Sequence, residues 1–263
     1  RGLYEIRPRG KNGVMVYVAC SNKQKGATAR KNCKAACIAC MKCTKICPEV
    51  TVEENLSRIP PSVSAKLYGA ELAAGCPTGA IVEYDETQKV WDMLNDKDIY
   101  TIVQIAPAVR VAIGEEFGFD FGENLTGKTY AALRRMGFKR IFDTNFGADL
   151  TIIEEANEFV RRFTQEPESL PMFTSCCPGW VRFVKLHYPE FTAQLSSAKS
   201  PHQMMGAVVK NTLAAEAAEA GKRLFVVSIM PCVAKKYECD VPELATEADA
   251  DVDAVLTVRE FDR

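Results

Sequence analysis

From about Tyr100 onward, short apolar runs alternate with helical patterns, and this alternation limits the fold more than any other feature of the chain. The apolar runs predict strands at residues 100–105, 140–143, 172–174, 224–230 and 253–257. Helical patterns cover about residues 149–163, 178–187 and 200–220. Pro107 suits the first turn of another helix, and Thr126 is the predicted N-cap of one that ends near Gly137. The alternation favours an α/β fold with a parallel sheet covered by helices.

Cysteines follow two of the predicted strands. Cys176 and Cys177 come directly after residues 172–174, and Cys232 comes after residues 224–230. Since α/β folds build their sites in loops at the carboxyl ends of parallel strands, we expect the two loops to converge on one bound group. The alternative for the Cys-Cys-Pro string is a pair of buried thiols before a proline that starts a helix.

The chain of 263 residues holds 11 cysteines, and their close spacing indicates metal binding rather than disulfides. No secretory segment is visible, so we predict a reducing, cytoplasmic setting. The net charge of −1 gives no electrostatic case for nucleic acid, and no apolar stretch is long enough to cross a bilayer. The chain starts at Arg1, and residues 253–257 read as a strand entering an unfinished helix. We therefore expect a piece of a longer or split protein.

A second cysteine group lies near the N-terminus. Cys37, Cys40 and Cys43 form Cys-x2-Cys-x2-Cys, and Cys47 follows three residues later, before a proline. This run resembles that of bacterial ferredoxins, in which three thiolates hold one cubane cluster and the fourth cysteine ligates another. A structural zinc site is the alternative, but it would ordinarily use two Cys-x2-Cys pairs.

A symmetrical second run would end at Cys76, but it is degenerate. Its other three positions are Lys66, Gly69 and Leu72. We therefore predict one [4Fe-4S] cluster, with these ligands: Cys37, Cys40, Cys43 and Cys76. Cys47 is then left without its usual cluster. Cys20 and Cys33 are spare thiols that we expect to be buried or free, and the alternative is that they bind a second cluster together with Cys47.

We predict three segments in the chain. Residues 1–32 form a basic, turn-rich segment with a strand near residues 14–19, residues 33–80 form a small α+β ferredoxin-like domain, and residues 81–263 form the α/β domain. The stretch from residue 3 to residue 47 is also similar to the ferredoxin-bearing subunit of Rnf-type electron-transfer complexes.

Two strings around the later cysteines carry the main resemblance. Residues 174–180 read Thr-Ser-Cys-Cys-Pro-Gly-Trp, and residues 230–238 read Met-Pro-Cys-Val-Ala-Lys-Lys-Tyr-Glu. They resemble the first two cluster-binding motifs of the iron-only ([FeFe]) hydrogenases, in that family's order and approximate spacing. The resemblance extends from about Ala80 onward. The family's third motif, a cysteine pair among glycines, has no counterpart before Arg263.

The resemblance implies a role for each motif residue. In the family, the H-cluster consists of a [4Fe-4S] cubane bridged to a two-iron unit that carries CO, cyanide and a dithiolate with a bridgehead amine. Cys177 and Cys232 match two of the four cubane ligands, and Cys176 matches the thiol that exchanges protons with the amine. Lys235 matches the donor to a cyanide, a role that suits a compact ammonium. Met230 matches a side chain that lines the two-iron unit.

Other residues belong near the cofactor in the same resemblance. Ala106 and Pro107 match a segment that packs beside it, and Pro231 lies within the second motif. His187 and His202 are interpreted as ordinary helix residues.

A proton path is also implied. Glu155, Glu158 and Arg162 have the i, i+3, i+7 spacing of one helix face. The family's path uses two glutamates and an arginine at this spacing, together with a serine that matches Ser196. From the spacing alone a solvated charged face is the favoured interpretation, and the resemblance favours proton transfer.

The resemblance as a whole implies an [FeFe]-hydrogenase that interconverts protons, electrons and dihydrogen, with electrons relayed through the N-terminal cluster. It implies ferredoxin or another redox partner, further hydrogenase or Rnf-like subunits, and maturation proteins. Because two cubane ligands have no counterpart, this stretch alone is not expected to hold the complete cofactor. A cytosolic iron–sulfur assembly scaffold is the non-enzymatic alternative, although such scaffolds generally lack the thiol that matches Cys176. The third possible function is that of a redox-relay or hydrogen-sensing relative of the hydrogenases.

Overall fold

The computed structural model of the chain describes residues 17–18, 23–32, 36–59, 72, 75–77, 81–82, 85–246 and 249–262. The chain divides into two compact units, Arg1–Tyr84 and Asp85–Arg263. The division falls a few residues after the boundary predicted at residue 80. Cys20 and Cys33 lie outside the described residues, so their interpretation as spare thiols stays a prediction, as does a separate segment 1–32.

The N-terminal unit combines short strands and helices, in agreement with the predicted α+β class. Its elements are β1 (Tyr17–Val18), α1 (Gly26–Asn32), α2 (Lys42–Ile46), β2 (Thr51–Glu53), β3 (Leu56–Arg58) and β4 (Ile81–Val82). β1 pairs antiparallel with β4, and β2 pairs antiparallel with β3. Of the strand predicted near residues 14–19, only residues 17–18 are described. A small core of buried apolar side chains, including Val50, Leu56 and Leu72, supports the unit.

The C-terminal unit is built on a parallel four-stranded sheet, which confirms the predicted fold class. Its strands are β5 (Ile99–Ile105), β6 (Arg140–Asp143), β7 (Arg223–Met230) and β8 (Ala254–Thr257), in the order β6-β5-β7-β8. The central strands β5 and β7 are buried almost throughout, as expected for parallel strands covered on both faces. Ile105 lies opposite Ile229, so the carboxyl ends of β5 and β7 meet at one edge of the sheet.

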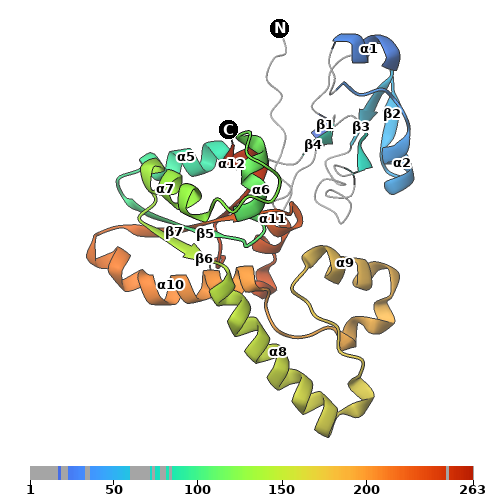
Figure 1. The fold of residues 1–263 in the computed structure, drawn as a ribbon. Coiled ribbons are helices and arrows are strands. Elements are labelled where there is room, and N and C mark those ends of the chain that lie inside the picture. The colour runs from blue at the N-terminus through green and yellow to red at the C-terminus, as the bar shows by residue number, and fades with distance from the viewer. Residues whose placement is uncertain are drawn as a thin grey trace. The chain divides into compact units, whose positions relative to one another are not determined.

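Helices cover both faces of this sheet (Figure 1). The helices of this unit are α5 (Thr87–Asn95), α6 (Val109–Glu116), α7 (Thr126–Met136), α8 (Asn145–Gln165), α9 (Pro178–His187), α10 (Pro201–Glu219), α11 (Ala234–Cys239) and α12 (Val258–Phe261). α8 packs on α10 and α9 packs on α11, so α8 and α9 are not part of the cover. Short 3₁₀ turns lie at η1 (Pro167–Ser169), η2 (Pro189–Gln194) and η3 (Pro242–Leu244). α10 packs against both β7 and α8. Among the described residues, no helix is long and apolar enough to cross a membrane.

The ends of the helices follow local chemistry. Pro178 and Pro201 occupy the first turns of α9 and α10, where a missing N–H costs nothing. Gly137 ends α7 in the left-handed conformation, with φ of 110°. The prediction that Thr126 caps α7 was wrong by one residue. Thr126 is the first helical residue, and its backbone N–H donates to Asn124 Oδ1 at 3.1 Å. Pro107 lies just before α6 rather than within it.

The strand predicted at residues 172–174 was wrong. Only Phe173 forms a β-bridge, an isolated parallel one with Leu195, and it lies outside the four-stranded sheet. Phe173 N–H donates to Gln194 O at 2.8 Å, and Ser196 N–H donates to Phe173 O at 2.7 Å. A run of three residues has too few ladder bonds to compete for a place in the sheet, so this segment pairs with the chain that leads into α10.

Candidate active site

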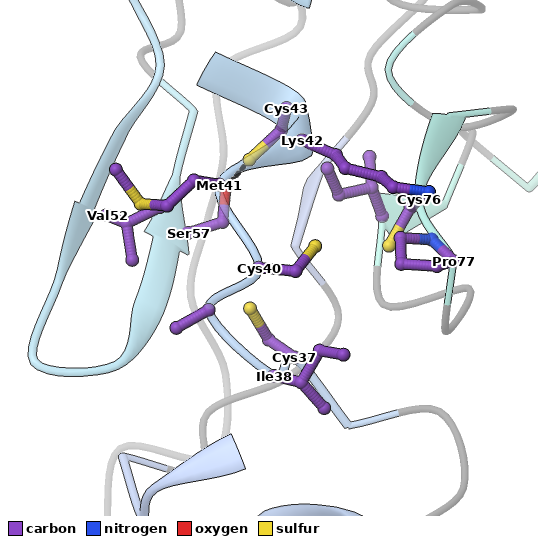
Figure 2. A pocket seen from close by; sticks show the side chains of 12 residues that line it. Cys37, Ile38, Cys40, Met41, Lys42, Cys43, Val52, Ser57, Cys76 and Pro77 are labelled. Carbon is purple, nitrogen blue, oxygen red and sulfur yellow. Dashed lines mark hydrogen bonds between the residues drawn. The ribbon is translucent and has the colours of Figure 1, made fainter. Parts of the chain in front are cut away.

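Four cysteines of the N-terminal unit line one cavity. They are Cys37, Cys40, Cys43 and Cys76. Figure 2 shows the sulfur atoms of Cys37, Cys40 and Cys76 turned toward the same space. Cys43 Sγ lies 3.2 Å from Ser57 Oγ. Cys47, in contrast, is buried in the apolar core of the unit and does not line the cavity.

Four thiols around one cavity are the kind of donor set that can hold an iron–sulfur cluster, in which each cysteine binds a separate iron. Within the described part of the chain, no group of three or more His, Cys, Asp or Glu side chains forms a site for a single metal ion. The cavity is also lined by apolar side chains, among them Val52 and Ile81, as expected around an iron–sulfur cluster.

The cysteine pair of the C-terminal unit lies at the start of α9. Cys177 is the N-cap, and its Sγ accepts a hydrogen bond from Trp180 N–H at 3.5 Å. The Trp180 ring packs edge-on against Phe173, with 5.9 Å between the ring centroids. Cys176 and Cys177 are both exposed, so the alternative of two buried thiols was wrong. Cys232 is partly buried in the loop between β7 and α11.

Lys235 joins the two cysteine loops. Its Nζ donates to the carbonyl oxygen of Cys176 at 2.8 Å and to Glu238 Oε2 at 2.9 Å. The guanidinium of Arg182 in α9 also lies over the Tyr237 ring of α11, at 4.0 Å. The loops therefore meet, but through α9 and α11. We expected each cysteine loop to follow a strand of the parallel sheet, and this prediction was wrong for the Cys176 loop.

Four further predicted residues lie at the carboxyl edge of β5 and β7. Ala106 N–H donates to Ile229 O at 3.0 Å, which ties the end of one strand to the other. Ala106 and Met230 are buried, whereas Pro107 and Pro231 are exposed. This edge of the sheet is therefore the expected place for a site in a parallel α/β fold.

Glu158, Arg162 and Ser196 form one buried network. Arg162 donates to Glu158 Oε1 through Nη2 at 2.6 Å and through Nε at 3.1 Å. Ser196 Oγ donates to Glu158 Oε2 at 2.8 Å, and Arg162 Nη2 also donates to Leu195 O at 2.9 Å. All three predicted side chains are buried, so the interpretation as a solvated face was wrong for this part of α8.

The network keeps Glu158 ionised. Burial alone would raise the pKa of its carboxyl group, but hydrogen bonds from Ser196, Arg162 and the Ser197 amide outweigh burial and hold the pKa below its ordinary value.

The other two predicted proton-path residues lie outside this network. Glu155 is half-buried, and its Oε1 has no hydrogen-bond partner among the described residues. The exposed Cys176 approaches the network through its neighbour, because the Ser175 hydroxyl donates to the carbonyl oxygen of Ser196.

A polar network that sequence reasoning missed lies behind Lys235. Glu238 is buried, and its Oε2 also lies 2.9 Å from His202 Nδ1. His202 Nε2 lies 2.8 Å from Ser228 Oγ. The i, i+3 spacing of Lys235 and Glu238 could have indicated their pairing. No sequence pattern links His202 to either residue, so its interpretation as an ordinary helix residue was incomplete.

The protein belongs to the iron-only hydrogenase family. Residues 99–263 match the family described as iron only hydrogenase large subunit, C-terminal domain. The NADP-reducing hydrogenase subunit HndD of Solidesulfovibrio fructosivorans is 43% identical over 244 residues, which cover 86% of this chain and 42% of that protein. Iron hydrogenase 1 of Clostridium pasteurianum is 46% identical over 185 residues, which cover 70% of this chain and 32% of that protein. The chain thus spans less than half of either relative.

A relative named as an iron–sulfur assembly factor and a solved structure extend the comparison. The cytosolic Fe-S cluster assembly factor narfl of Danio rerio is 32% identical over 162 residues, which cover 59% of this chain and 39% of that protein. The structure of apo [FeFe]-hydrogenase from Chlamydomonas reinhardtii superposes with a TM-score of 0.63 and 41% identity, covering 68% of this chain and 47% of that one. The fold and the family are therefore those of the iron-only hydrogenases.

Proposed function

We propose that the protein to which this chain belongs is an [FeFe]-hydrogenase that reversibly reduces protons to dihydrogen. The observation that carries the proposal is the position of Lys235. Its ammonium binds the Cys176 carbonyl and the Glu238 carboxylate, so it brings both cysteine motifs to one place beside the carboxyl edge of β5 and β7.

The residues at this place fit part of an H-cluster. Cys177 and Cys232 offer accessible thiols as two cubane ligands, and the remaining ligands would come from residues outside this chain. Lys235 offers an ammonium to an anionic ligand of the two-iron unit. The segments with Ala106 and Pro107, and with Met230 and Pro231, would pack beside the cofactor. When bound, the cofactor supplies the redox chemistry, and the protein holds it and moves protons.

Proton movement would use the buried Glu158 network together with Cys176 and Glu155, which lie outside it. Cys176 would exchange protons with the cofactor through its exposed thiol. Glu158, ionised at rest, is a proton acceptor that Ser196 contacts directly, and Arg162 orients it. Glu155, whose buried Oε1 lacks a partner among the described residues, would extend the path along α8.

Electrons would enter through the N-terminal unit. Its four cavity-lining cysteines would hold one [4Fe-4S] cluster, with ferredoxin or another redox protein as the donor. Further hydrogenase or Rnf-like subunits, maturation proteins and a cytoplasmic location belong to the same proposal.

Cysteine substitutions in the N-terminal unit test the ligand set. Cys76→Ser is expected to lower the iron content by about four atoms per chain, since one cubane is lost. Cys47→Ser is the matched control, and it should keep that iron because Cys47 does not line the cavity. Iron analysis and the reduced-cluster electron paramagnetic resonance signal measure both. Equal iron loss in the two variants would contradict the assignment.

Glu158 gives a pH-dependent prediction. Because its pKa is lower in the folded protein than the ordinary 4.5, its ionised form stabilises the fold above that pH, and this contribution is lost as the pH falls below it. Glu158→Gln should therefore reduce the free energy of unfolding at pH 7, and the difference from the parent should shrink in acid. Urea unfolding at a series of pH values measures this effect. Exposed Glu154→Gln, on the same helix, should show a small difference at every pH.

The activity itself is tested by a gas assay. The native protein, matured and purified without oxygen, is expected to evolve dihydrogen from a reduced viologen dye, and protein from cells without the maturation proteins is expected to evolve none. Iron-replete, matured protein that evolves no dihydrogen would contradict the proposal.

An iron–sulfur assembly scaffold is the second candidate, because relatives of that kind are 32% identical to the chain. The adjacent Cys176, beside the proposed ligand Cys177, favours the enzyme. A scaffold would transfer iron-55-labelled cluster to an apo-acceptor protein without evolving dihydrogen, and that result would select this candidate.

A further inference from the structure

We propose that Ser228, His202 and Glu238 form a buried hydrogen-bonded chain that positions the Lys235 ammonium against the Cys176 loop. His202 is then a positioning residue of the site. The inference deepens the proposed function, and it rests on that function only for its effect on turnover.

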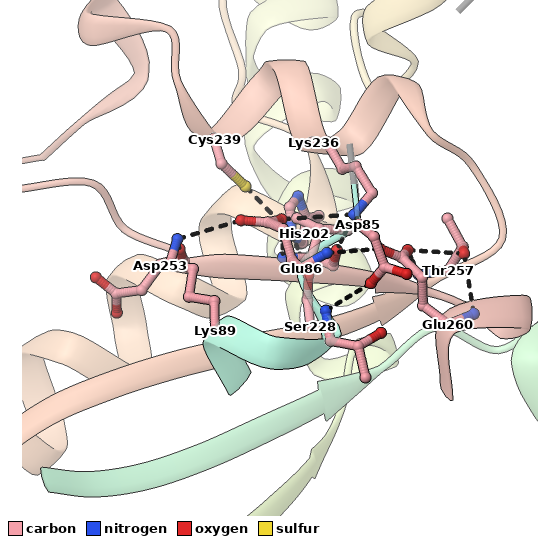
Figure 3. Close-up of polar contacts among 12 residues, drawn as sticks. Asp85, Glu86, Lys89, His202, Ser228, Lys236, Cys239, Asp253, Thr257 and Glu260 are labelled. Atoms are coloured by element: carbon pink, nitrogen blue, oxygen red, sulfur yellow. Dashed lines mark hydrogen bonds and ion pairs between the residues drawn. The ribbon is translucent and has the colours of Figure 1, made fainter. Parts of the chain in front are cut away.

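The three hydrogen-bonded residues come from three different elements of the fold. Ser228 belongs to β7, His202 to α10 and Glu238 to α11, with exposed fractions of 0%, 1% and 3%. Ser228 Oγ lies 2.8 Å from His202 Nε2, and His202 Nδ1 lies 2.9 Å from Glu238 Oε2. Figure 3 shows His202 and Ser228 at the centre of a dense polar region. These hydrogen bonds therefore anchor the carboxylate of Glu238 both to the sheet, through Ser228, and to α10, through His202.

The chemistry of the partners sets the direction of the hydrogen bonds. An ionised carboxylate can only accept, so His202 donates from Nδ1–H to Glu238. In the neutral ring Nε2 then accepts, and the donor is the Ser228 hydroxyl. Burial lowers the pKa of His202 despite the nearby Glu238 carboxylate, which agrees with a neutral ring.

The anchored carboxylate determines where Lys235 can reach. Glu238 Oε2 accepts from both His202 and Lys235, each at 2.9 Å. Cys239 Sγ lies 4.0 Å from His202 Nε2, and Gln203 Nε2 donates to Cys239 Sγ at 3.6 Å, so Cys239 also packs against the imidazole ring. A lysine side chain has many rotamers, and holding it in one costs entropy. Because the carboxylate is fixed, Lys235 Nζ is held at 2.8 Å from the Cys176 carbonyl oxygen.

Two substitutions distinguish the hydrogen bond made by His202 Nδ1 from the one made by Nε2. His202→Asn keeps an N–H donor near the position of Nδ1 and so keeps the bond to Glu238. His202→Gln places its amide near the position of Nε2, so it can bond Ser228 but not Glu238. If His202 only filled buried space, the two variants would affect Lys235 equally.

The readout is the rate at which an amine-acylating reagent modifies Lys235, measured by mass spectrometry of the full chain. Exposed Lys185 in the same digest is the reference. We expect His202→Gln to raise the relative rate by about tenfold, as the loss of a hydrogen bond to a charged group implies, and His202→Asn to raise it much less. Equal rates in the parent and both variants would overturn the inference.

Nitrogen-15 NMR of the parent protein gives a test that does not depend on the folding of a variant. His202 is expected to be the neutral tautomer protonated at Nδ1, and a proton at Nε2 alone would overturn the inference. Neither measurement needs the cofactor. An inactive protein with the expected tautomer and acylation rates would therefore refute the proposed function and keep this inference.

Discussion

Replacing Cys176 with alanine is expected to lower dihydrogen turnover by at least about 10²–10⁴-fold, the usual contribution of a positioned proton-transfer group. The thiol of Cys176 is exposed beside the loop that Lys235 fixes, and the Ser175–Ser196 contact holds its backbone close to the buried Glu158 network. Methyl cannot carry a proton, so the proposed path ends there. Turnover is measured with a reduced dye and gas chromatography, alongside iron analysis.

Cys177→Ala is the matched control, one residue away in the same loop. The Cys176 variant should keep the iron content of the parent and lose turnover, whereas the Cys177 variant should lose iron and turnover together. This difference follows from the separate roles of the two thiols. Unchanged turnover in the Cys176 variant, or equal iron loss in both variants, would contradict these roles.

Lys236→Met is expected to reduce the free energy of unfolding by about 3–5 kcal/mol, as is usual when one partner of a buried ion pair is removed. Lys236 Nζ lies 2.8 Å from Glu260 Oε1 and 3.6 Å from Glu86 Oε2, and all three side chains are buried. It also donates to Val255 O at 2.7 Å. Figure 3 shows this cluster, which ties α11 to α12 and to the start of α5. Methionine would leave two carboxylates buried without their shared cation.

The loss is measured by urea unfolding of the native protein under anaerobic conditions. Lys139→Met replaces an exposed lysine of the same unit and should change the unfolding free energy by no more than about 0.5 kcal/mol. Similar losses in the two variants would show that the Lys236 cluster does not contribute as its burial implies. Lys89, 3.2 Å from Glu86 Oε1, can offset the charge of only one of the two carboxylates.

The sheet was predictable because its central strands, β5 and β7, are long and apolar and contain several β-branched residues. β6 has the bounds predicted for it, and β5, β7 and β8 differ by a single residue at one end. α9 also begins and ends where it was predicted, because Pro178 starts it and Pro189 disfavours a helical conformation at the preceding Tyr188, which ends it. In contrast, the run at 172–174 carried only a short apolar signal, and its backbone hydrogen bonds go to the segment before α10 instead of to the four-stranded sheet.

Parts of the site were predictable only from motif spacing or resemblance. The pairing of Glu158 with Arg162 follows from their i, i+4 spacing, but their burial depends on Ser196, which arrives from a distant loop. The contact of His202 with Glu238 joins α10 to α11 and leaves no periodic trace in the sequence. Helix α11 is short and follows a cysteine loop, so its intrinsic helix propensity alone does not stabilise it. Tertiary contacts such as that of Lys235 with Cys176 stabilise it instead.

The most direct test of the central claim is an infrared spectrum of the native protein, matured and purified without oxygen. Iron-bound CO and cyanide absorb where protein groups do not. The proposed hydrogenase predicts these bands together with a reduced-cubane signal from the N-terminal unit. A protein that shows the cubane signal with a full complement of iron, but no CO or cyanide bands, would contradict the hydrogenase assignment.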